Sequence, residues 1–406
     1  MLRVSTMHQF RTGEDSLVAR QRELLAVQQQ IASGKRLLSP ADDPLAAADG
    51  AGIRSAVAQF DQFRRNQDHA QYLLNLGESA LAGVIGGIQD VQEKLVAAGN
   101  GALGDNERRM IAGELDGVLA RLVGLANAGD GAGGFLFGGA RSGAAPFAQS
   151  GADVVYLGDE IAQRLEVAQD RLLQVRFSGD ALFNKIRPGN GSFTTAAAAG
   201  NSGTGWIDAG AVSDPAALTG RPYTLSFSVA AGVTTYTVTR HEASGPPTTV
   251  ASGAYGAPLA LRFDGIQVNL NGSPADGDSF AIEPAGFRPL FESLAQAIAA
   301  LRQPVAGDAA AGARQRTALA GAQASLAGAF DHLLLKRADL GTGLQELEAY
   351  GQLNEDRTLE AQTRLSRVED LDIAAAAAEL SRRQLTFEAA LKSYSMVSRL
   401  SLFDFL

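Results

Sequence analysis

Apolar side chains recur every seven residues at the N-terminal end of the chain. The members of this repeat are Phe10, Leu17, Leu24, Ile31 and Leu38. A seven-residue spacing keeps one seam of an α-helix turned toward a partner helix. We therefore expect an amphipathic helix that ends near Ser39, because Pro40 disfavours helical geometry in the residue before it. Asp43 followed by Pro44 predicts that a second helix starts there, with a capping carboxylate and a proline at its first position.

The C-terminal end carries the same spacing. Its repeat consists of Ile373, Leu380, Phe387 and Tyr394, with Leu391 on the same seam, and the chain closes with the apolar residues Leu402, Phe403, Phe405 and Leu406. A fully buried Leu or Phe side chain stabilises a fold by roughly 1.5–3 kcal/mol, but a lone pair of amphipathic helices buries only one flank of each. We therefore expect both terminal stripes and the final apolar residues to form an assembly surface. Ordinary packing inside one subunit is the alternative.

Longer helices are predicted between these two arms. Heptad repeats run over residues 53–95, with Gln67 as one polar member, and over residues 319–347. A shorter amphipathic helix covers about 106–125, after a glycine-containing break at 99–104. The simplest arrangement is nested, with the two arms paired and the inner helices paired.

The segments between the predicted helices have sequence patterns that indicate β-structure. Residues 135–178 hold short apolar runs among turn residues, and residues 188–286 form a block rich in Gly, Ser, Thr, Asn and Pro. Apolar and polar residues alternate over 223–229 and on both sides of Asp264-Gly265, a favoured two-residue hairpin turn. We predict a small antiparallel β domain inserted between the helical segments.

These patterns predict a mainly α fold with an inserted β domain. Its parts are nested N- and C-terminal coiled-coil helices, a helical middle domain with a β-hairpin region, and an antiparallel β outer domain. The expected boundaries are 1–43 for the N-terminal assembly helix, 44–187 and 287–359 for the two parts of the helical middle domain, 188–286 for the outer β domain, and 360–406 for the C-terminal assembly helix.

Composition narrows the functional classes. The chain has 406 residues, of which 46% are hydrophobic and 19% charged, and this is typical of folded domains. The net charge of −9 argues against a general nucleic-acid binder and against adsorption to an anionic membrane. The absence of cysteine excludes disulfides, thiolate metal sites and cysteine nucleophiles. We find no apolar run that predicts a secretory signal or a transmembrane helix.

The sequence gives only weak signals for a catalytic, cofactor-binding or metal-binding site. Residues 129–134 match the GxGxxG pattern, but a nucleotide site needs a strand before this loop and a helix after it, whereas here a helix precedes and extended chain follows. The segment is better explained as a flexible connection, and a nucleotide-binding enzyme is the alternative from a different functional class. The four histidines lack a metal-ligand spacing. We predict no enzyme, and no catalytic, cofactor-binding or metal-binding residues.

Two short segments of the N-terminal arm resemble the flagellin family. Residues 33–37 read Ser-Gly-Lys-Arg-Leu, and residues 40–44 read Pro-Ala-Asp-Asp-Pro. Residues 368–406 are similar to the matching C-terminal helix of that family, and residues 272–283 are similar to a turn and strand of its outer domain. The resemblance covers both arms. It implies terminal helices that form an inner tube, a helical middle domain and an outward β domain.

Within that family, the two ends of the chain resemble subunits of the junction between hook and filament more than filament subunits. The resembling residues are 1–6, Met-Leu-Arg-Val-Ser-Thr, and 401–406, Ser-Leu-Phe-Asp-Phe-Leu. The resemblance implies a structural adaptor in the extracellular bacterial flagellum, exported by the flagellar type III apparatus without a cleaved signal peptide. The implied partners are a hook-side junction protein, flagellin, further copies of the chain in a ring, and an export chaperone at the C-terminal region. A filament-forming flagellin is the alternative.

Overall fold

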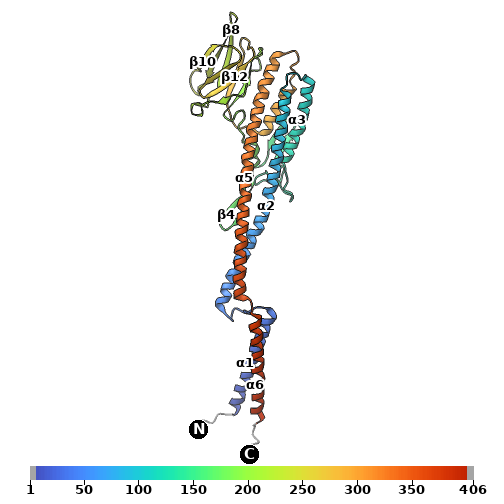
Figure 1. The fold of residues 1–406 in the computed structure, drawn as a ribbon, viewed down its shortest axis with the longest axis vertical. Coiled ribbons are helices and arrows are strands. Elements are labelled where there is room, and N and C mark those ends of the chain that lie inside the picture. The colour runs from blue at the N-terminus through green and yellow to red at the C-terminus, as the bar shows by residue number, and fades with distance from the viewer. Residues whose placement is uncertain (1–5, 400–406) are drawn as a thin grey trace, which may run out of the picture. The chain divides into compact units, whose positions relative to one another are not determined.

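The structure is a computed structural model that describes the backbone of residues 6–399 and the side chains of residue 8 and residues 11–396. The chain divides into two compact units (Figure 1). A terminal unit joins the two ends of the chain, up to Arg65 and from Ala349 onward. A central unit contains residues 66–348. The unit boundaries fall inside two long helices, α2 (Pro44–Ala98) and α5 (Ala309–Glu369).

In the terminal unit, α1 (Thr6–Ser33) packs against α6 (Ile373–Arg399), so the two arms pair as expected. The N-terminal helix is shorter than predicted. It ends at Ser33, because Gly34 adopts a φ of 70°, the left-handed geometry that stops a helix and that glycine adopts without steric cost. The expected end near Ser39 was therefore wrong, and Leu38 lies in the connector that follows α1, not on its stripe.

The start of α2 follows the expected capping chemistry. The Asp43 carboxylate accepts a hydrogen bond from the Ala46 backbone N–H at 3.0 Å. Asp42 closes the preceding turn, since its Oδ2 accepts from the N–H groups of Leu38 (3.0 Å) and Ser39 (2.7 Å). Both carboxylates thus accept backbone hydrogen bonds: Asp42 from the connector, and Asp43 from an N–H group in the first turn of α2, which the helix itself leaves free.

The core of the central unit is built from the predicted heptads. It joins the inner part of α2 to α3 (Asp105–Ala126), α4 (Leu290–Arg302) and α5. Every leucine of the α5 heptad, from Leu319 to Leu347, is buried. On α2, a Cβ atom at Gly87 would lie 2.6 Å from Leu122 of α3, so the glycine allows these helices to pack closely. An ion pair between Glu78 and Arg337 joins α2 to α5.

Two small antiparallel hairpins follow α3. They are formed by β1 (Phe147–Ser150) with β2 (Asp153–Tyr156) and by β3 (Gln163–Ala168) with β4 (Arg171–Arg176). Residues 135–137 were expected to be extended. Phe135 forms an isolated β-bridge with Gly129, whereas Leu136 and Phe137 lie in a turn and are buried in the helical core. Their apolar character therefore comes from core burial and not from a strand. A single π-helical turn, η1 (Asp180–Asn184), follows β4.

The β domain contains two antiparallel sheets that share one apolar core. The strand order is β10-β9-β8-β13-β5 in one sheet and β11-β12-β6 in the other, where β7 also pairs with β12. As expected, Asp264 (φ 43°) and Gly265 (φ 77°) form the turn between β11 and β12. The elements are β5 (Phe193–Ala197), β6 (Trp206–Ile207), β7 (Ala211–Val212), η2 (Pro215–Ala217), β8 (Tyr223–Ala230), β9 (Val233–Arg240), β10 (Thr248–Ala254), β11 (Leu259–Phe263), β12 (Ile266–Asn271) and β13 (Ser279–Pro284).

Two hydroxyl groups of α5 accept hydrogen bonds from the backbone of the β domain. The Gly189 N–H donates to Ser325 Oγ at 2.8 Å, and the Ile207 N–H donates to Thr317 Oγ1 at 3.2 Å. Both hydroxyl-bearing residues are buried and stand eight positions apart, on one face of the helix. Along the described part of the chain, no helix is long and apolar enough to cross a membrane.

Candidate assembly interface

The α1–α6 pair has an inner seam made by most of the predicted stripe. Val27 and Ala376 are buried in it. The close approach of the two helices is visible at Gly13, where a Cβ atom would lie 2.9 Å from the Tyr394 ring. The half-buried members of the stripe are Leu17, Leu24, Ile31, Leu380, Phe387 and Tyr394. Within a single subunit these side chains are thus partly used to hold the two arms together.

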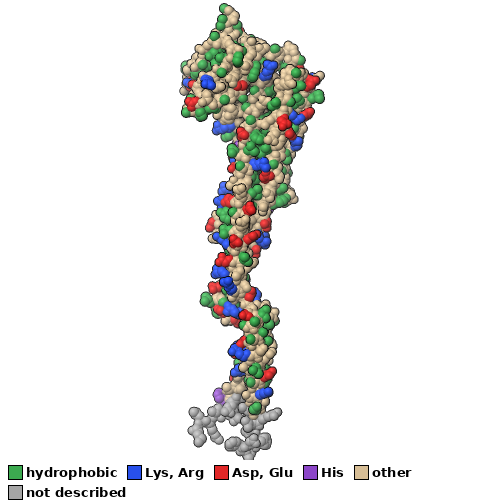
Figure 2. Space-filling model, in the orientation of Figure 1, with side chains coloured by type: hydrophobic (Ala, Val, Ile, Leu, Met, Phe, Trp, Pro, Cys, Tyr) green, Lys and Arg blue, Asp and Glu red, His purple; other side chains and the backbone are tan. Residues whose placement is uncertain are grey.

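A second set of apolar side chains on the pair is exposed. On α1 it includes Val18 and Leu25, which are 40% and 48% exposed and stand seven residues apart. On α6, Leu385 and Met396 are 69% and 64% exposed and stand eleven residues apart, which is close to three full helical turns. Figure 2 shows apolar side chains on the visible surface of these helices. We call Val18, Leu25, Leu385 and Met396 the outer stripe.

Of the remaining predicted site residues, three are exposed and the others are not described. Leu391 is 44% exposed on α6, Ile373 is 65% exposed at its first position, and Leu38 is 40% exposed in the connector after α1. The Phe10 side chain and Leu402, Phe403, Phe405 and Leu406 lie outside the described residues. The sequence reasoning missed Leu385 and Met396, although their eleven-residue spacing was a signal that could have found them.

Charged groups join the pair across its edge. Glu23 of α1 forms an ion pair with Arg383 of α6, and Glu379 contacts the same guanidinium at 2.6 Å. The hydrogen bond from Arg383, with a further one from Arg382, holds the pKa of Glu379 below its ordinary value. These groups are partly exposed, so they add little stability, but they favour one pairing of the two helices.

The segment between α1 and α2 is fastened to the segment between α5 and α6. The Arg36 N–H donates to Glu369 O at 2.7 Å, and the Leu371 N–H donates to Gly34 O at 3.0 Å. The Glu369 carboxylate pairs with Lys35 Nζ at 2.9 Å and with the Arg54 guanidinium. Residues of the Ser-Gly-Lys-Arg-Leu segment therefore bring the two ends of the chain together. We call this set of contacts the connector clasp.

The GxGxxG segment is closed upon itself. Asp130 Oδ1 accepts hydrogen bonds from the N–H groups of Ala132 (2.9 Å) and Gly134 (2.8 Å), and Asp130 Oδ2 pairs with the partly buried Arg176. Burial opposes ionisation of Asp130, but these donors hold its pKa below the ordinary value. Two N–H groups of the loop are thus bound to a carboxylate of the protein's own chain and are not free to bind a phosphate.

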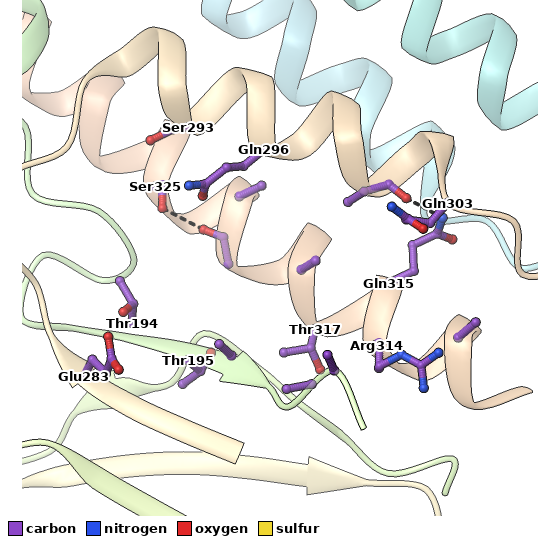
Figure 3. A pocket seen from close by; sticks show the side chains of 18 of the residues that line it. Thr194, Thr195, Glu283, Ser293, Gln296, Gln303, Arg314, Gln315, Thr317 and Ser325 are labelled. Atoms are coloured by element: carbon purple, nitrogen blue, oxygen red, sulfur yellow. Dashed lines mark hydrogen bonds between the residues drawn. The ribbon is translucent and has the colours of Figure 1, made fainter. Parts of the chain in front are cut away.

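A cavity of about 700 Å³ with a mixed polar and apolar lining lies between the β domain, α4 and α5 (Figure 3). Several of its lining groups already have partners in the chain. Gln315 Nε2 donates to Ala300 O at 2.8 Å, and Thr195 Oγ1 donates to Asp208 O at 2.7 Å. Among the described residues, no group of three or more His, Cys, Asp or Glu side chains is arranged to hold a metal ion.

Comparison with known proteins gives two family matches. Residues 4–142 match the bacterial flagellin N-terminal helical region. Residues 196–284, which include most of the β domain, match the D2-like domain of flagellar hook-associated protein 1.

Individual relatives give the same indication. Flagellar hook-associated protein 3 of Salmonella typhimurium is 26% identical over 403 residues, which is 99% of each chain. The crystal structure of Xanthomonas campestris FlgL is 30% identical, with a TM-score of 0.71, and the match covers 77% of this chain and 99% of that one. The flagellar junction protein FlgL of Legionella pneumophila is 27% identical, with a TM-score of 0.71, over 79% of this chain and 99% of that one.

Proposed function

This chain belongs to the flagellar hook-associated protein 3 (FlgL) family, and from that premise we propose how its terminal helices serve the assembly. It is a structural subunit of the bacterial flagellum that connects the hook to the filament. We propose that the α1–α6 pair is the surface through which it meets its neighbours. The observation that carries this is the outer stripe, which leaves large apolar side chains exposed on helices whose seam already holds them together.

The seam residues and the outer stripe have different proposed roles. The seam residues, such as Leu24 and Phe387, fix the pairing of the two arms. The outer stripe, with Leu391 and Ile373, then presents an apolar surface that a single subunit leaves in contact with water. Burying such side chains against neighbouring helices supplies the favourable free energy of assembly.

Its partners lie in the hook and in the filament. We propose a hook-side junction protein on one side, flagellin on the other, and further copies of the chain beside it in a ring. We also propose that an export chaperone covers the C-terminal region before export, since an exposed apolar helix would otherwise associate prematurely. Export without a cleaved signal peptide is part of the same proposal.

A filament-forming flagellin is the second candidate, and seeded polymerisation of the purified full-length protein separates the two. The protein is mixed with flagellin seeds or with purified hooks that carry the hook-side junction protein, and the products are scored by sedimentation and electron microscopy. We expect monomers that cap these ends without elongating. Long filaments made of this chain alone would overturn the junction role.

We propose a structural role and not a catalytic one. The GxGxxG segment was the feature that suggested a nucleotide-binding enzyme. Two of its N–H groups donate to Asp130, and this supports a connecting role. Titration calorimetry with ATP and NAD tests this point. Saturable nucleotide binding that is lost on mutation of the segment would support the alternative hypothesis of a nucleotide-binding enzyme.

A further inference from the structure

The Glu369 carboxylate stands where local helix chemistry disfavours it. Glu369 is the last residue of α5, and the C-terminal end of a helix carries partial negative charge, which repels a carboxylate. The residue is also only 6% exposed, so the ionised group has lost most of its water. Neither helix formation nor burial therefore accounts for a glutamate at this position.

Two cations from the opposite end of the chain compensate this carboxylate. Lys35 Nζ lies 2.9 Å from Oε2, and the Arg54 guanidinium pairs with Oε1. Lys35 belongs to the connector after α1, and Arg54 belongs to α2. One side chain therefore binds three segments: the end of α5, the connector and α2. Removing a cation from a buried pair is costly because it leaves an uncompensated charge.

The surrounding backbone is shaped to admit this group. A Cβ atom at Gly50 of α2 would lie 3.0 Å from Glu369 Oε1, so a larger residue there would crowd the carboxylate. Next to it, Arg36 Nη2 donates to Val368 O at 2.9 Å, and Lys35 and Asp370 form an isolated β-bridge. These contacts join the two connectors at the point where α1 and α6 leave the longer helices.

We propose that Glu369 is a positioning residue for assembly: by clasping Lys35 and Arg54 it fixes the direction in which the α1–α6 pair leaves α2 and α5. A helix pair attached by two connectors would sample many directions if the connectors were independent. With the clasp closed, the outer stripe is presented in one direction, and its neighbours do not have to select a rare orientation. This inference rests on the proposed function only for its consequence in assembly.

Distance measurements on the full-length protein test the clasp directly. Because the chain has no cysteine, spin labels attach solely at Ala58→Cys on α2 and Ala389→Cys on α6, both exposed positions. We expect a single narrow distance peak in the parent protein. Glu369→Gln, which keeps the size of the side chain and removes its charge, is expected to lose this peak and give a broad distribution. Glu355→Gln, an exposed position on the same helix, is the matched control and is expected to keep it.

A second pair of variants guards against simple misfolding. Lys35 is half exposed, so neither Lys35→Arg nor Lys35→Met changes the packing of a core, and the cost of losing the cation in Lys35→Met falls on the clasp. We expect Lys35→Arg to keep the narrow peak and Lys35→Met to broaden it, with unchanged thermal unfolding of the central unit. A narrow peak in both Glu369→Gln and Lys35→Met would overturn the inference.

Capping of purified hooks supplies the functional measurement. We expect Glu369→Gln to lose most of its capping activity while Glu355→Gln caps as the parent does. A broadened distance peak with full capping would overturn the assembly role of the clasp. If the parent protein itself does not cap hooks, the proposed function fails, and the distance measurements still decide whether Glu369 positions the helices.

Discussion

Replacing Leu385 with Asp separates the outer stripe from the inner seam. Leu385 is 69% exposed, so about two-thirds of its surface is still available for burial in an assembly. Full burial of a leucine contributes roughly 1.5–3 kcal/mol, so assembly gains about 1–2 kcal/mol at this position. An aspartate loses that gain, and desolvation of its carboxylate adds a few kcal/mol more. The sum is about 4 kcal/mol for each subunit, which weakens the contact roughly a thousandfold.

The assay compares assembly with the stability of the monomer. Leu385→Asp is expected to unfold at the same temperature as the parent protein and to leave purified hooks uncapped. Gln384→Glu places a similar charge on the neighbouring exposed residue and serves as the control, which we expect to cap normally. Leu24→Asp lies in the seam, so there we expect loss of both the helix pairing and the capping. Normal capping by Leu385→Asp would refute the assignment of the outer stripe to assembly.

Three further predictions concern the stability of the fold. Phe387→Ala removes a half-buried ring from the seam between the two helices. We expect it to lower the stability of the α1–α6 pair by about 1–2 kcal/mol, measured by hydrogen exchange of the backbone amides of the pair. Arg176→Ala leaves the Asp130 carboxylate buried without its cation, and we expect a loss of about 3 kcal/mol or more in denaturant unfolding, against little change for the exposed Arg164→Ala. A hydrogen bond from Arg108, and after it those from two backbone N–H groups, lower the pKa of Asp105 from 3.8 to about 2. The ionised Asp105 therefore stabilises the fold above pH 4, and this stabilisation is lost as the pH falls toward 2. We expect an Asp105→Asn variant to differ from the parent in melting temperature at pH 5 and to converge with it near pH 2.

Local sequence patterns predicted most of the helices and the β-hairpin. The leucine heptad of α5 predicted a buried stripe because a seven-residue spacing repeats on one helix face, and every member from Leu319 to Leu347 is buried. The Asp264-Gly265 turn was predictable because few residue pairs adopt two successive positive φ angles. The end of α1 at Ser33 was also predictable, since a glycine such as Gly34 commonly terminates a helix. The prediction used Pro40 instead and so placed the end of the helix several residues too late.

The candidate site was predicted only in part. The heptad rule selects residues that face a partner helix, so it identified the seam, while Leu385 and Met396 follow a different spacing on the opposite side. The clasp could not be predicted, because Lys35 and Glu369 are 334 residues apart and no local pattern relates them. A lone glutamate at the end of a helix gives no sign of its distant partners until the fold brings them together.

The division of the chain between the two units has a consequence for the order of folding. The central unit is one uninterrupted stretch, residues 66–348, so its internal contacts do not require the two ends of the chain to meet. The terminal unit combines both ends, and closing a contact between such distant segments is entropically costly in an unfolded chain. Folding of the central unit first removes most of this cost. The surface that we propose for assembly is therefore completed last, and on that proposal a subunit becomes competent to assemble only after the rest of its chain has folded.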